Sequence, residues 1–282
     1  DMIVQNIGKE GHSGLSFTIP RDELEMTMEV IERLRQTLEI KDVSHSADVS
    51  KVSVVGSGMA HQPGVAEKMF RSISDAGINV LMITTSQIKI SVLVHKNDAR
   101  KALEAVHDTF ELETPAENEL PRLNEIPHPR AEAERVDVVD RLRGMEEIVI
   151  DEISLDTNQS RITLEGVPDR PGVAAMVFER VAKAGIVVDM IVQSHLDGNG
   201  LANISFTVPH HDLKATQELC KEIADELPCQ KISSSPKAAK LSVSGIGLRS
   251  HTGVAHRMFK ALGAGGINVE LTNTSEARVN VI

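Results

Sequence analysis

The chain repeats itself, and this repeat limits its possible folds more than any other feature of the sequence. The sequence DMIVQ at residues 1–5 returns at residues 189–193. Residues 51–92 return as residues 240–281, with 17 of 42 paired positions identical. Because such similar segments adopt the same fold, we predict two modules that share one architecture.

A fainter repeat lies inside the first one. The sequence PGV at residues 171–173 matches PGV at residues 63–65, and the match continues at a constant shift of 108 residues. Each module therefore contains two related units. We predict the second half of a first unit, a complete second unit, a complete third unit and a shortened fourth unit, at residues 1–46, 47–112, 157–234 and 235–282.

The third unit shows the order of its elements most clearly. A β-prone run at residues 161–164 is followed by a turn cluster, and then by Val173, Val177 and Val181 at helical spacing. Two strands joined by a hairpin, a second helix over residues 213–227 and a last strand come next. This βαββαβ order predicts an α+β, ferredoxin-like unit, in which two helices cover one face of an antiparallel sheet.

The segment between the modules differs from both. Residues 113–144 contain four of the eleven prolines and many charges, which predicts an exposed linker with a short helix. Residues 145–156 predict a strand. The first unit lacks its opening strand, loop and helix, and the last unit stops before its second helix, so we expect a fragment of a longer protein.

Composition argues against several classes of partner. The net charge is -11 and only 2% of the residues are aromatic, whereas nucleic-acid binding needs basic surfaces and often aromatic ones. No apolar run is long enough to cross a membrane. Cys220 and Cys229 have neither a metal-binding nor a redox spacing, which favours a reducing, cytoplasmic location.

The sequence predicts no catalytic residue and no metal site. The eleven histidines are scattered, and neither a phosphate-binding loop nor a nucleophile elbow occurs. An enzyme on a ferredoxin-like scaffold would need a nucleophile and a base in shared loops, and no such pair stands out. We therefore expect no cofactor in this chain.

The loop before the first helix of the third unit carries the most chemical information. The start of a helix offers unpaired N–H groups and partial positive charge, which suit a carboxylate. Gly172 allows close approach to the backbone, and the carboxylate of Asp169 suits an ammonium group. Together these groups would form a site for a free amino acid. The alternative is that the loop is only a turn at the start of a helix.

Three further polar residues have two possible explanations. Gln193 ends an apolar strand, and its amide either binds a ligand or meets water at the strand end. Asn79 and Asn268 lie in matching GINV turns, where asparagine either contacts a ligand or simply tolerates the turn geometry.

Several separated motifs resemble the regulatory ACT domains of aspartokinases. They are GVPDRPGV, GIVVDMIVQ, GIGLRSHTGV and the two GINV turns, at residues 166–173, 185–193, 245–254, 77–80 and 266–269. Four units in tandem resemble the aspartokinases whose regulatory region is duplicated. In this family one unit of a pair is inserted into the other, which implies that a strand at residues 148–155 joins the sheet of the fourth unit.

The resemblance implies a function as well as a fold. The chain would be the allosteric region of an aspartate kinase that senses lysine or threonine and inhibits the phosphorylation of aspartate. The family's kinase domain, with its ATP and Mg, is missing from this sequence but would belong to the parent polypeptide. A homodimer formed through the ACT units is also implied. A stand-alone ACT-repeat sensor that acts through protein contacts is the alternative.

The resemblance also assigns an effector site, which we expect between the third and fourth units. Its residues would be Asp169, Gly172, Ala174, Gln193, Asn268 and Val269. In the first module the matching residues are Gln5, Asn79 and Val80. The family's asparagine is replaced by Val187 and its glutamate by Gln87. The two modules therefore either differ in ligand or hold only one working site.

Overall fold

The computed structural model describes residues 2–7, 13–56, 59, 62, 64–86, 88–112, 149–196, 200–246, 253–275 and 278–282. The predicted linker and its short helix lie outside these residues. The first module contains β1 (Ile3–Ile7), β2 (Ser13–Phe17), a 3₁₀ turn (Arg21–Glu23), α1 (Leu24–Arg35), β3 (Val49–Val55), α2 (Val65–Asp75), β4 (Met82–Ser86), β5 (Lys89–His95) and α3 (Ala99–Thr109).

The second module contains β6 (Val149–Pro168), α5 (Val173–Lys183), β7 (Ile191–Leu196), β8 (Leu201–Pro209), α6 (Leu213–Glu226), β9 (Lys231–Ile246), α7 (Gly253–Ala264), β10 (Leu271–Thr274) and β11 (Arg278–Val281). In this module the order from β7 to β11 repeats that from β1 to β5, and β6 and α5 precede it. The predicted α+β class with an antiparallel sheet and repeated units is confirmed.

Helix α5 shows why these segments form helices where they do. Val173, Val177 and Val181 recur at helical spacing, and all three lie in the main core. Gly172 precedes the helix with a φ of 92°, and Gly185 follows it with a φ of 69°. Glycine adopts such left-handed angles at little cost, so these two glycines define the two ends of α5.

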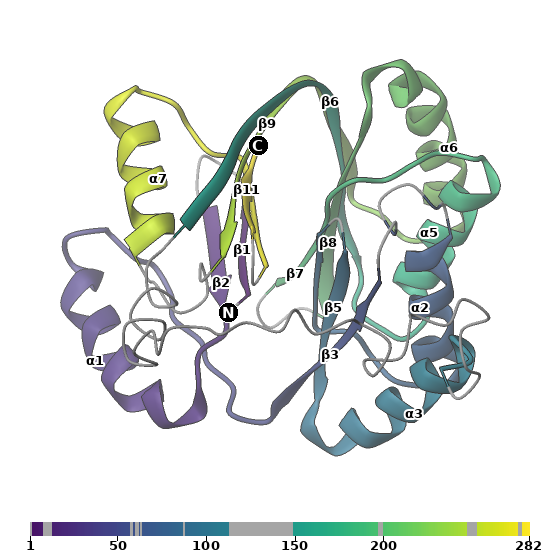
Figure 1. Cartoon of the computed structure of the whole chain (residues 1–282). Coiled ribbons are helices and arrows are strands. Elements are labelled where there is room, and N and C mark those ends of the chain that lie inside the picture. The colour runs from purple at the N-terminus through teal and green to yellow at the C-terminus, as the bar shows by residue number, and fades with distance from the viewer. Residues whose placement is uncertain are drawn as a thin grey trace, which may run out of the picture.

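The strands of the described residues form one antiparallel sheet, in the order β2-β1-β10-β11-β9-β6-β8-β7-β4-β5-β3. The long strands β6 and β9 arch over the molecule and connect its two halves, which face each other with the helices outside (Figure 1). Residues 149–156 of β6 pair with residues 240–246 of β9, and β9 also pairs with β11 of the fourth unit. This arch joins the third and fourth units through continuous strands.

The units of different modules pair through the edges that the arch leaves open. Strand β7 of the third unit pairs with β4 of the second, and β1 of the first unit pairs with β10 of the fourth. An unpaired strand edge is a liability for a soluble protein, and these pairings cover the edges at β7 and β10. The second and third units therefore form one side-by-side pair, and the first and fourth units form another.

The core is divided in the same way. The largest cluster lies between the sheet and helices α2, α3, α5 and α6 of the second and third units, and includes Phe70, Phe178 and Phe206. A smaller cluster, including Met2, Leu271, Met82 and Val192, fills the space between the two facing halves. Burial on both faces of the sheet fixes the relative position of the two pairs.

Candidate functional site

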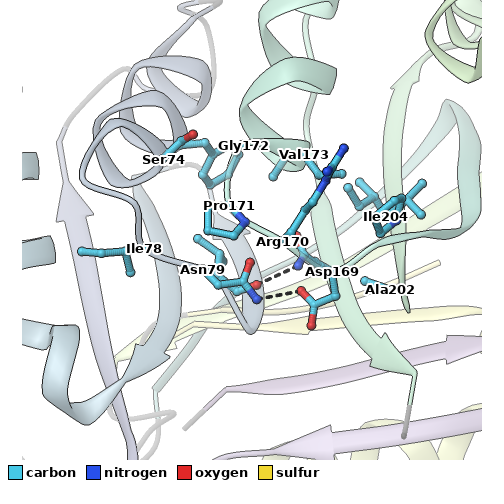
Figure 2. Close-up of a pocket in the computed structure, with 16 residues that line it drawn as sticks. Ser74, Ile78, Asn79, Asp169, Arg170, Pro171, Gly172, Val173, Ala202 and Ile204 are labelled. Atoms are coloured by element: carbon cyan, nitrogen blue, oxygen red, sulfur yellow. Dashed lines mark hydrogen bonds between the residues drawn. The ribbon is translucent and has the colours of Figure 1, made fainter. Parts of the chain in front are cut away.

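A small cavity lies where the third unit's Pro-Gly loop meets the second unit. Its wall includes Asp169, Gly172 and Gln193 from the third unit, and Asn79 and Val80 from the second. Figure 2 shows the loop and the second unit's residues converging from two sides. The cavity has a volume of about 20 Å³, which is room for about one water molecule. A free amino acid is larger than this, so it would displace part of the cavity's wall or extend out of its open side.

The loop places the start of α5 at this cavity. The N–H of Val173 donates to the carbonyl of Arg170 at 3.4 Å, and that of Met176 donates to the carbonyl of Gly172 at 2.9 Å. The positive end of the helix dipole therefore lies beside the cavity, where it favours a negatively charged group.

Asp169 is anchored to the neighbouring unit. The Asn79 side-chain amide donates to Asp169 Oδ1 at 3.0 Å, and Figure 2 shows the two side chains facing each other. The backbone N–H of Asp169 donates to the carbonyl of Gly200 at 2.8 Å. A carboxylate held in this way is preorganised for an ammonium group, which would compete with Asn79 for it.

Gln193 presents an unsatisfied acceptor. The side chain is 5% exposed, and its Nε2 donates to the carbonyl of Val80 at 2.8 Å. Its Oε1 is buried and has no hydrogen-bond partner among the described residues. A buried acceptor without a partner is costly in free energy, so this atom marks a place where a ligand donor would be stabilised.

The pair of units has a local twofold axis that generates a second hollow. In the pairing of β4 with β7, Ile83 lies opposite Gln193, and Thr84 lies opposite Val192. Because Thr84 and Val192 are equivalent positions of the two units, the axis passes through this pair. The second hollow has a volume of about 60 Å³ and includes Val187 and Thr85 in its wall. Val187 is the equivalent of Asn79, and Thr85 is the equivalent of Gln193, at a shift of 108 residues in the sequence.

The second hollow differs from the first at the positions equivalent to Asn79 and Gln193. Thr85 Oγ1 donates to the carbonyl of Asp189 at 3.3 Å and accepts from the N–H of Ile191 at 2.8 Å. Val187 has no polar side-chain atom where Asn79 has an amide. Of these two hollows, only the first combines a carboxylate with an unsatisfied amide oxygen, so it is the stronger candidate for a polar ligand.

The pair formed by the first and fourth units contains a glutamine contact like that between Gln193 and Val80. Gln5 Nε2 donates to the carbonyl of Val269 at 3.1 Å, as Gln193 does to Val80. Here the amide oxygen has a partner, because Thr272 Oγ1 donates to Gln5 Oε1 at 3.3 Å.

The predicted site residues thus fall into two groups rather than one. Asp169, Gly172, Ala174 and Gln193 meet Asn79 and Val80, whereas Gln5 meets Val269. The prediction that Asn268 lies beside Gln193, between the third and fourth units, is wrong, because the neighbours of Gln193 across the unit boundary are Val80 and Ile83 of the second unit. Continuous strands already join those two units, so the third unit's free edge at β7 pairs with the second unit instead.

The sequence analysis missed two residues near the cavity. Ser74 lines it from the end of α2, and Ile83 lies opposite Gln193 in the sheet. Neither residue has a motif of its own. The only available signal was the alignment of the repeats, in which Ile83 corresponds to Thr272.

Gly172 provides a direct test of the loop geometry. We predict that Gly172→Ala lowers the free energy of unfolding by about 1–3 kcal/mol, because alanine is strained at a φ of 92°. The new Cβ would also lie 3.1 Å from Ser74 Oγ. Urea unfolding measures the change. Gly263→Ala in α7 is the matched control, since nothing lies within 4 Å there and helical alanine is favoured. Equal effects of the two substitutions would contradict the assignment.

Other chemistry is not supported by the described residues. They contain no group of three or more His, Cys, Asp or Glu side chains that could hold a metal ion. Burial raises the pKa of the Cys220 thiol to about 12, so this thiol stays protonated and is a poor nucleophile. In the same parts of the chain, no helix combines the length and apolar character that a membrane span requires.

Comparison with known proteins agrees with the repeated units. The model of a family described as ACT domain matches residues 52–110, 162–222 and 241–282, which together make up more than half of the chain. The chain belongs to the ACT domain family. The three matched segments correspond to the second, third and fourth units.

The relatives of this ACT chain are aspartate kinases. The crystal structure of aspartate kinase from Synechocystis covers 100% of the chain with a TM-score of 0.83 and 28% identity, and the match spans 46% of that protein. Aspartate kinase from Pseudomonas fluorescens is 36% identical over 144 residues, which are 51% of this chain and 35% of that protein. Aspartokinase from Helicobacter pylori is 38% identical over 138 residues, 49% of this chain and 33% of that protein.

These matches define what the ACT chain resembles. It is similar to an aspartate kinase regulatory region with multiple ACT domains. The chain spans about a third of the length of the curated relatives and less than half of the Synechocystis protein.

Proposed function

We propose that this chain is the allosteric region of an aspartate kinase and that it binds lysine or threonine in the cavity between its second and third units. The observation that carries the proposal is the meeting of Asp169, the start of α5 and the unpartnered Gln193 Oε1 at one cavity. The similarity to the Synechocystis aspartate kinase over the whole chain supports the same function.

Each group has a role in holding a free amino acid. Asp169 accepts hydrogen bonds from the ammonium group, and the first turn of α5 stabilises the carboxylate through its dipole and N–H groups. Gln193 Oε1 accepts from a donor on the side chain. Because the cavity has room for about one water molecule, we infer that binding rearranges the second and third units.

This rearrangement is the basis of the regulation that we propose. An effector shifts an equilibrium only if it binds one arrangement better than the other, and coupling energies of about 1–3 kcal/mol are typical. The kinase domain of the parent polypeptide, with ATP and Mg, would phosphorylate aspartate, and the effector would inhibit that step. A homodimer formed through the ACT units and a cytoplasmic location complete the proposal.

Titration calorimetry with this chain tests the binding function. We predict that lysine or threonine binds with one site per chain in the second–third unit pair. As controls, n-butylamine and acetate each supply only one of the two charged groups, and neither should bind measurably at concentrations that saturate the effector. Binding of neither lysine nor threonine would overturn the proposal.

A further inference from the structure

We propose that the cavity selects amino acids whose side chain donates a hydrogen bond, and that Ile83 sets this selectivity. The inference rests on the proposed function and specifies its ligand. It arises from a difference between the two pairs of units that the repeat makes directly comparable.

The orientation of the Gln193 amide is fixed by its neighbour. A carbonyl oxygen accepts hydrogen bonds but cannot donate them, so the side-chain group facing the Val80 carbonyl at 2.8 Å must be the NH₂. The amide oxygen therefore faces away from the Val80 carbonyl and is available to a hydrogen-bond donor. That oxygen is buried and has no partner among the described residues, and Gln193 lines the cavity.

In the pair formed by the first and fourth units, the equivalent glutamine is Gln5, and its amide oxygen has a hydrogen-bond partner. Gln5 donates to Val269, the equivalent of Val80, but its Oε1 already accepts from Thr272. Thr272 lies directly opposite Gln5 in the sheet, just as Ile83 lies directly opposite Gln193. Side chains that are directly opposite in an antiparallel pair share one face and are in contact.

A single position therefore decides whether the glutamine oxygen is available. Threonine at position 272 supplies a hydroxyl donor to the glutamine, whereas Ile83 is apolar and 0% exposed. With isoleucine at this position, a ligand must supply the missing donor. The terminal ammonium of lysine or the hydroxyl of threonine can do so, while an aliphatic side chain such as that of methionine or isoleucine leaves the oxygen unpaired.

Such a site discriminates by the cost of an unsatisfied acceptor. Sites that hydrogen-bond a substrate group reject analogues without it more strongly than apolar pockets reject an extra methylene. We therefore expect the wild-type chain to prefer lysine over L-norleucine, or threonine over L-2-aminobutyrate, by roughly tenfold or more. Titration calorimetry with the four amino acids measures these two ratios.

Two variants at one position isolate the effect. Ile83→Thr places a hydroxyl opposite Gln193, as Thr272 does opposite Gln5. It should lower the preference for lysine over L-norleucine, or for threonine over L-2-aminobutyrate, by about tenfold. Ile83→Val has the same branched shape as threonine but no hydroxyl, and it should keep the ratio within about twofold of the wild type. Circular dichroism establishes that both variants are folded.

The outcomes separate this inference from the proposed function. If the wild type binds lysine or threonine but shows no preference over the analogue, or if the two variants have equal ratios, the inference is overturned and the function stands. If neither amino acid binds, both are overturned. Should Ile83→Thr fail to fold, Gln193→Met replaces it, and an unchanged ratio in that variant overturns the inference.

Discussion

Replacing Asp169 with Asn lowers the affinity of the chain for its amino-acid effector by about ten- to a hundredfold. Hydrogen bonds to charged groups contribute roughly 1.5–3 kcal/mol, and the substitution removes the charge that faces the ligand's ammonium. The shape of the side chain is retained, and an amide oxygen at this position can still accept from Asn79. The fold should therefore be intact, and the loss should appear in the dissociation constant measured by titration calorimetry.

Asp225→Asn is the matched control for charge. Asp225 is an exposed residue of α6 and does not line the cavity, so its replacement changes the net charge by the same amount without touching the site. Affinities of the two variants that agree within a factor of two would show that Asp169 does not hold the ammonium group. A long-range effect of net charge would weaken both variants equally and would fade with added salt.

The sequence was sufficient to predict the local fold because the relevant signals are local. The spacing of Val173, Val177 and Val181, and the glycines that flank them, define α5 without any knowledge of its neighbours. The repeat then extends that prediction to each related unit. For the same reason, Asp169 and Gly172 could be recognised as a helix-start site from a short stretch of sequence.

The pairing of the units could not be predicted in the same way. Strands β7 and β10 both leave an open edge, and nothing in a single sequence states which edge meets which. The register that brings Ile83 to Gln193 joins residues more than a hundred positions apart. The arrangement of the candidate site, with Asn79 rather than Asn268 beside Asp169, is therefore a product of tertiary packing.

Helix α1 shows a second limit of local pattern. Apolar residues recur at helical spacing in this part of the sequence, but the helix has no buried residue; they are Leu24, Met28, Ile31, Leu34 and Leu38. Leu34 and Leu38 are 43% and 62% exposed, whereas their equivalents Ile223 and Leu227 are each 1% exposed. In the third unit, β6 pairs with β8; in the first, the described residues include no strand on the free edge of β2. An apolar stripe marks a face that can be buried, and its burial depends on what covers it.

The largest expected effect on stability is at Phe178, which joins the second and third units. Its ring is 3% exposed and lies 5.4 Å from Phe70 of α2 and 5.6 Å from Phe206 of β8, measured between ring centroids. Phe178→Ala should lower the free energy of unfolding by about 3–5 kcal/mol, because it removes a buried ring and leaves a cavity. Urea unfolding followed by circular dichroism measures the loss.

The same substitution connects the core to the candidate site. Phe70 lines the cavity that contains Asp169, and it packs against Phe178, so loss of the Phe178 ring should loosen the wall of the proposed effector site. We expect Phe178→Leu, which fills most of the space, to keep effector binding at a smaller cost in stability. Ile153→Ala, at a residue 66% exposed, controls for a change of one large apolar side chain and should shift stability by no more than about 0.5 kcal/mol. If Phe178→Ala costs no more than this control, the aromatic contact does not hold the two units together, and the shape of the cavity must depend on other contacts.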